Sequence, residues 1–80
     1  MKLPRDISGK ALAEAPQRMG YAVTRQTGSH MRLTTLVLGE HHVTIPNHAV
    51  LRIGTLSSIL SEVCEHHRLA RETLIEKLFK

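Results

Sequence analysis

Aromatic residues are almost absent from this 80-residue chain, which contains one Tyr, one Phe and no Trp. This scarcity argues against modules that stack unpaired bases on aromatic platforms. Cysteine is equally rare, and because the single Cys64 cannot form an internal disulfide, a reducing cytoplasm is the expected location. Apolar runs are all far shorter than the roughly 18 residues of a membrane span, and no signal peptide is expected either.

Acidic residues are outnumbered by basic ones, with seven Asp and Glu against eleven Lys and Arg. The formal net charge of +4 favours a polyanion as partner, nucleic acid first and a membrane surface second. The excess lies in residues 1–55, which hold seven basic and three acidic residues, whereas residues 56–80 hold four of each sign. We therefore expect one small domain, residues 1–80, whose first two-thirds face the polyanion.

A first helix is predicted over residues 8–19, with Ser8 as its N-cap and Gly20 as its stop. Pro16 falls inside it and removes a hydrogen bond to Leu12, so a kink or an early end is expected.

Three strands are predicted next, over residues 21–26, 30–38 and 42–45. Their apolar residues recur at odd numbers, and the two-residue period of a strand therefore places the odd residues on the core face. Core residues must pair with core residues, which sets Val23 opposite Leu33.

The second hairpin follows from the same alternation. It pairs Val37 with Val43 and leaves a three-residue turn at 39–41, which contains the Gly that such turns favour. Extending this register along the strands sets His48 opposite Arg32.

A second helix is predicted to begin at Gly54–Thr55, with Thr55 as its N-cap. Its apolar stripe comprises Leu56, Ile59, Leu60, Val63 and Cys64. A last helical segment covers residues 71–79, either continuous with the previous helix or separated from it near residues 67–70. The fold class is therefore α+β, in the order α-β-β-β-α-α, with a three-stranded antiparallel sheet and helices on one of its faces.

Six histidines invite a metal hypothesis, but their spacing does not support one. His41 and His42 on a strand point to opposite faces, and His66 and His67 on a helix diverge by about 100°. CxxC and HExxH motifs are missing from the sequence, so solvated surface histidines are predicted and no metal.

His30 differs from the others because its even number points it away from the core, directly after the glycine turn at 27–29. The predicted registers set Arg32 opposite Thr24 on one side and His48 on the other. Two histidines and an arginine would thus meet at one end of the open face, where an imidazole suits proton transfer near neutral pH. An exposed, inert turn histidine is the alternative.

The basic residues also allow two interpretations. Arg18, Arg25 and Arg32 lie in an acid-free stretch, residues 15–39, which is either a nucleic-acid contact or a solvated face. The segment 8–10 either binds phosphate at a helix N-terminus or acts only as a cap.

Several short segments, taken together, resemble one protein family. They are Ile7–Lys10 opening the first helix, Gly20–Tyr21 opening the first strand, Arg25–His30 at the hairpin, Val43–Pro46 followed by His48, and Gly54–Leu56 with Ile59 and Leu60 opening the later helix. Over nearly the whole chain, and in the right order, they are similar to the HicA toxins, also called YcfA-like mRNA interferases.

This resemblance implies a double-stranded-RNA-binding-domain-like fold and cleavage of RNA by one histidine on the second strand, held inactive by a HicB antitoxin. His30 matches that histidine, and Gly28 and Ser29 match the turn that presents it. Lys10 matches a basic position on the first helix that would contact phosphate.

The combined prediction is the toxin of a type II toxin–antitoxin system, a metal-independent endoribonuclease that cleaves mRNA without a cofactor. Its predicted protein partner is a HicB-like antitoxin, and no membrane partner is expected. The RNA 2′-OH would attack the adjacent phosphorus, with His30 as general base or general acid and His48 in the second proton-transfer role. Arg25, Arg32 or Lys10 would offset the phosphorane charge. The alternative is a non-catalytic RNA-binding module, which recognises duplex shape without aromatics.

Overall fold

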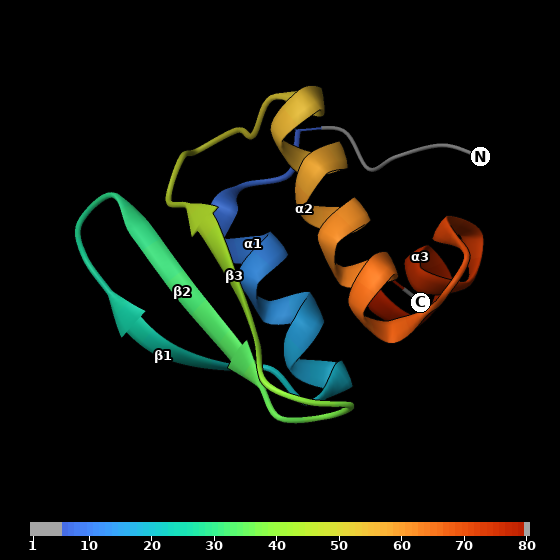
Figure 1. Ribbon diagram of the computed structural model, residues 1–80. Helices are drawn as coiled ribbons and strands as arrows, with labels where there is room; N and C mark the ends of the chain where they lie inside the picture. The colour runs from blue at the N-terminus through green and yellow to red at the C-terminus, as the bar shows by residue number, and fades with distance from the viewer. Residues whose placement is uncertain (1–5, 80) are drawn as a thin grey trace.

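Residues 6–79, which the computed structural model describes, form a three-stranded antiparallel sheet with the helices on one of its faces (Figure 1). The elements are α1 (Gly9–Glu14), the 3₁₀-helix η1 (Ala15–Met19), β1 (Ala22–Gln26), β2 (His30–Thr35), β3 (His41–Pro46), α2 (Ile53–His67) and α3 (Arg71–Phe79). The predicted α+β class and element order are confirmed. Residues 1–5 and 80, with Lys2 and Arg5 of the predicted basic surface, lie outside the described part.

The first helix is interrupted at the proline, as its sequence predicts. The Ser8 side chain caps α1 by accepting a hydrogen bond from the Ala11 N–H at 3.0 Å. Because Pro16 has no N–H, the α-helix ends at Glu14 and the chain tightens into η1. Gly20 then ends η1 with a φ of 94°, a left-handed conformation that glycine adopts without steric cost.

The core face of the sheet is built by β2 and β3. Five of their odd-numbered residues are buried, namely Met31, Leu33, Thr35, Val43 and Ile45, and the sixth, His41, is half-buried. The alternation predicted for these two strands is confirmed. In β1 it holds only as far as Val23, which pairs with Leu33 as predicted. Every residue of β1 is nevertheless exposed, and Val23 is 40% accessible, because the helices pack chiefly over β3 and leave this edge strand uncovered.

The register of the second hairpin differs from the prediction. Val43 pairs with Leu33, not Val37, because β2 ends at Thr35 and the chain reverses through residues 36–40. Leu38 supplies a left-handed φ of 59° in this longer turn. The shift is an even number of residues, so the core face is kept, while Val37 becomes 47% exposed instead of joining the core.

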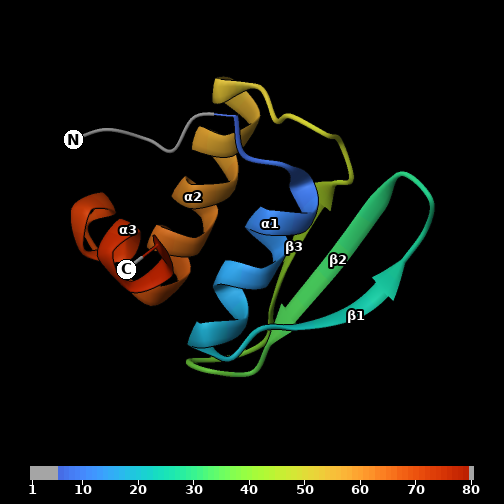
Figure 2. The same ribbon diagram turned by 180° about the vertical axis from the view of Figure 1, so that it is seen from behind.

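The later helices lie on the same side of the sheet as α1, with α3 farthest from it (Figures 1 and 2). The predicted apolar stripe of α2 is buried at Leu56, Ile59, Leu60 and Val63, and Cys64 is half-buried. The N-cap prediction is wrong: α2 begins at Ile53 with Arg52 as its cap, and Thr55 lies inside the first turn. Arg68, with a φ of 56°, ends α2 and separates it from α3.

Within residues 6–79, the helices are all too short or too polar to cross a lipid bilayer.

Candidate active site and nucleic-acid interface

His30 opens β2 on the uncovered face of the sheet and is exposed to solvent. Its Nδ1 lies 2.9 Å from the Ser29 hydroxyl, so one ring nitrogen is engaged and Nε2 is left for a ligand. When the Nδ1–H donates to Ser29, Nε2 of the neutral ring has a free lone pair and is a base, and in the protonated ring Nε2 also carries a proton and is an acid. The contact therefore holds the ring in place for either direction of proton transfer.

The turn before His30 is held by its own side chains. The Thr27 hydroxyl accepts hydrogen bonds from the backbone N–H groups of Ser29 at 3.3 Å and His30 at 3.1 Å. The Asn47 N–H donates to the Ser29 carbonyl at 2.8 Å and ties the turn to the chain after β3. The resemblance matched Gly28 and Ser29 to the turn that presents a histidine, and the structure places them there.

Arg25 and Arg32 lie directly opposite each other, because β1 contains a bulge. Regular pairing would set Thr24 against Arg32 and point Arg25 to the other face. The predicted pairing of Arg32 with Thr24 is therefore wrong: register shifts between Val23 and Arg25, and the extra residue moves Arg25 to the open face.

The side chain of Thr24, at the bulge, stabilises it through hydrogen bonds to β2. The Thr24 hydroxyl lies 3.3 Å from the Arg32 carbonyl and 2.9 Å from the Thr34 hydroxyl. Arg32 is two residues from His30 on one strand, about 7 Å along the sheet. Like charges directly opposite each other are destabilising, and both arginines are exposed, so the pair is open to an anion.

His48 does not lie where the sequence predicted it. The shifted register sets Thr44 opposite Arg32 and Pro46 opposite His30, so His48 falls in the loop beyond the end of β3. Its carbonyl accepts a hydrogen bond from the Gly9 N–H at 2.9 Å, which docks the start of α1 at the His30 end of the sheet. Lys10 is exposed on the first turn of α1, directly after Gly9.

Gly9 is the residue that permits this docking. A Cβ at this position would lie 1.9 Å from the carbonyl oxygen of Pro46 and 3.1 Å from Cα of Asn47. Since both neighbours are backbone, no side chain can move aside. The close approach of α1 to β3 thus depends on the missing side chain.

A comparison with protein families matches residues 9–63 to the family described as the "HicA toxin of bacterial toxin-antitoxin". The matched segment is more than half of the chain. The protein belongs to the HicA toxin family. It is therefore the toxin of a toxin–antitoxin system, which has an antitoxin as partner. Comparisons with curated proteins and with solved structures find no match.

In this HicA toxin, the described residues contain no group of three or more His, Cys, Asp or Glu side chains arranged to hold a metal ion. Cys64 lies half-buried beside the apolar stripe of α2, and burial raises the pKa of its thiol. A raised thiol pKa disfavours the thiolate, which is the form that acts as ligand or nucleophile.

Three histidines gather around Tyr21 at the other end of the toxin's sheet. The Tyr21 hydroxyl lies 2.8 Å from Nδ1 of His41 and 3.2 Å from Nε2 of His67. The rings of His41 and His66 stack at 4.4 Å, and His66 Nε2 donates to the Val37 carbonyl at 2.9 Å. The prediction of solvated histidines is therefore wrong for these three.

Burial shifts the pKa values of His41, His67 and Tyr21. Desolvation is the main cause that lowers the pKa of His41 and of His67, and repulsion between the clustered imidazoles adds to it. Burial, together with Glu62, raises the pKa of Tyr21 to about 12. All of these groups favour their neutral forms, which suits a structural contact between α2 and the sheet.

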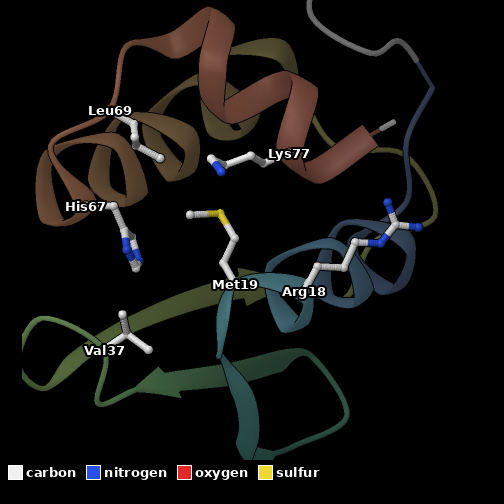
Figure 3. A pocket seen from close by; sticks show the side chains of 6 residues that line it. All are labelled: Arg18, Met19, Val37, His67, Leu69 and Lys77. Atoms are coloured by element: carbon white, nitrogen blue, oxygen red, sulfur yellow. The ribbon is translucent and has the colours of Figure 1, made fainter.

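A pocket of about 420 Å³ opens beside the cluster, between η1, the turn after β2 and α3 (Figure 3). It is lined by Arg18, Met19, Val37, His67, Leu69 and Lys77. The Arg18 guanidinium donates to the Leu78 carbonyl at 3.3 Å, which holds this arginine against α3 and away from Arg25 and Arg32. Apart from Arg18, the pocket contains none of the predicted site residues.

Proposed function

We propose that this HicA toxin is a metal-independent endoribonuclease that cleaves mRNA and uses His30 as its acid–base residue. The observation that carries the proposal is the combination on the open face: an exposed imidazole oriented by Ser29, beside the Arg25–Arg32 pair. A proton-transfer group next to two guanidinium groups suits a phosphodiester. Membership in a toxin family supports the same reading.

The proposed reaction is intramolecular. The 2′-oxygen of one ribose attacks the adjacent phosphorus, the bond from phosphorus to the 5′-oxygen breaks, and a 2′,3′-cyclic phosphate and a 5′-hydroxyl result. Nε2 of His30 takes the proton of the 2′-OH or gives one to the leaving oxygen, and Arg25 and Arg32 offset the phosphorane charge. One positioned acid–base group contributes about 10²–10⁴-fold, which implies a slow enzyme.

Further residues at the same end of the sheet complete the proposed RNA contact. Lys10 contacts a neighbouring phosphate, while Gly28 and Ser29 bring the turn close to the backbone of the RNA. His48 is proposed for the second proton transfer from its place in the loop after β3, which a His48→Ala variant tests.

The proposed antitoxin is a HicB-type protein that covers His30 directly. The surface around His30 and Arg32 is positively charged and exposed, so acidic or polar groups of the partner would complement it and speed association. Hydrogen exchange in the toxin–antitoxin complex should show protection of residues 27–32. Protection confined to residues 56–80 would contradict direct occlusion.

The experiment that tests the function uses three oligonucleotides of one sequence: all-RNA, all-DNA, and RNA with a single 2′-deoxyribose at the cleaved position. The purified toxin should cut the all-RNA strand, but neither the DNA nor the chimera at its modified position, because the attacking hydroxyl is missing there. Cleavage of the chimera at the modified position would contradict the mechanism. Binding of RNA without cleavage would instead show a non-catalytic RNA-binding module.

A further inference from the structure

A second polar feature crosses the open face of the sheet, beyond the arginine pair. It is a chain of hydrogen bonds that links all three strands and ends in a carboxylate. Thr24 lies 2.9 Å from Thr34, Thr34 lies 2.6 Å from Nδ1 of His42, and His42 Nε2 lies 2.8 Å from the Glu40 carboxylate. The imidazole of His42 is therefore fixed on both sides.

The exposed end of this series of hydrogen bonds is the carboxylate of Glu40, an acidic group on an otherwise basic face. Glu40 is the only acidic residue between Glu14 and Glu62 in the sequence. Its side chain is 65% exposed and that of His42 is 34% exposed, so both are open to a ligand. A carboxylate repels phosphate and accepts hydrogen bonds, so the part of an RNA that binds here must be a hydrogen-bond donor.

The spacing on the sheet points to a neighbouring nucleotide. Thr34, the partner of His42 in the register, lies four residues from His30 on the same strand and the same face. At about 3.3 Å per residue the separation is roughly 13 Å, with Arg32 half-way. An RNA whose scissile phosphate lies between His30 and the arginine pair would reach Glu40 and His42, roughly 7 Å beyond Arg32, with its next nucleotide.

We propose that Glu40 and His42 form a base-recognition subsite that selects an unpaired base with an exocyclic amino group and rejects uracil. This inference rests on the proposed function and names the specificity of that same face. Cytosine, adenine and guanine each offer an amino group to the Glu40 carboxylate, whereas uracil flanks its single N–H with two carbonyl oxygens. His42, held by Glu40 and Thr34, offers its ring for stacking, in a chain that has few other aromatic rings.

The test uses a library of single-stranded RNA, randomised around the cleavage site, with two readouts. Wild-type toxin is profiled by cleavage, and His30→Ala toxin is profiled by binding, so base preference is measured even where cleavage is lost. We expect uracil to be disfavoured about tenfold at one position within three nucleotides of the cut. The Glu40→Gln variant should reduce this discrimination below threefold, because the amide presents donors as well as an acceptor.

The matched control is Glu14→Gln, which removes an exposed carboxylate from α1 rather than from the sheet. It should keep the full discrimination against uracil. Unchanged discrimination in Glu40→Gln, or none in the wild type, would overturn the subsite even if cleavage is robust. Failure of the proposed function looks different: base preference in the binding profile without any cleavage. Absence of RNA binding would overturn both.

Discussion

Arg25 and Arg32 face each other across the first hairpin, on the same side of the sheet as His30. In the free protein this arrangement places two positive charges where a sheet normally avoids them. A single-residue bulge at Thr24 produces it, and the Thr24 hydroxyl stabilises the bulge through Thr34 and the Arg32 carbonyl. Bulges often re-aim a side chain next to an active site, and this one aims Arg25 at the candidate phosphate position.

Loss of either arginine should weaken RNA binding uniformly across sequences. Arg25→Ala and Arg32→Ala should each reduce the slope of log Kd against log salt by about one, because each removes one phosphate contact. The measurement is RNA affinity at four or more salt concentrations. Lys77→Ala, on α3, is the control and should leave the slope unchanged. An unaltered slope in both arginine variants would remove the anion site from the open face.

Gly9→Ala should destabilise the protein, because the new Cβ would lie 1.9 Å from the Pro46 carbonyl oxygen. Overpacking of this kind typically costs about 1–3 kcal/mol. Gly54→Ala is the matched control: no atom lies within 4 Å of its Cβ, and alanine in a helix stabilises by about 0.5–1 kcal/mol relative to glycine. Urea unfolding of both variants measures the difference. Equal stability of the two would show that α1 does not dock closely on β3.

Folding stability should fall as the solution is acidified below about pH 6.5. The pKa values of His41 and His67 are lowered in the folded protein, so the unfolded chain binds more protons in this range and is favoured there. The pKa of Tyr21 is raised to about 12, so stability should also fall as pH rises from 10 towards 12.

Unfolding free energies of wild type and Tyr21→Phe between pH 5 and 11 test this dependence. The phenylalanine variant lacks the hydroxyl that contacts both rings and should lose the part of the alkaline fall that Tyr21 causes, while the part from the buried Cys64 thiol remains. A stability that stays flat between pH 7 and pH 5 would show that the cluster around Tyr21 is not closed in solution.

Cleavage should survive an excess of EDTA. Within residues 6–79 the potential ligand side chains form no group of three, and the proposed chemistry needs only an imidazole and guanidinium groups. The measurement is the cleavage rate with EDTA, compared with the rate after adding Mg²⁺, Mn²⁺ or Zn²⁺ to dialysed protein. Activity that is lost with EDTA and restored by one of these ions would contradict a metal-independent mechanism.

The sequence predicts the faces of β2 and β3 correctly, because alternation is a local property of residues such as Leu33 and Val43. It does not predict their register, since pairing Val43 with Val37 or with Leu33 obeys the same alternation. The left-handed conformation of Leu38, which lengthens the turn, has no signal in the sequence because residues of this type rarely adopt it. The misplacement of His48 follows from this one turn.

The exposed position of His30 could be predicted, whereas the arginine pair could not. Regular strand alternation puts Arg25 on the core face. Only the bulge moves it to the open face, and no sequence signal marks that bulge. The histidine cluster had signals that could have found it: His41 shares the odd numbering of the buried residues in β3, and His67 follows Val63 by one helical turn. Which of these rings meet depends on how α2 packs on the sheet, a non-local property.

The central claim is that His30 transfers a proton during RNA cleavage, and the most direct measurement is the single-turnover cleavage rate of His30→Ala near pH 7. The exposed side chain makes no core contact, so the variant should unfold at the same temperature as the wild type. The rate should fall at least about 100-fold. Glu72→Ala, an exposed change on α3, should keep the wild-type rate. A correctly folded His30→Ala protein that cleaves within threefold of the wild-type rate would contradict the assignment.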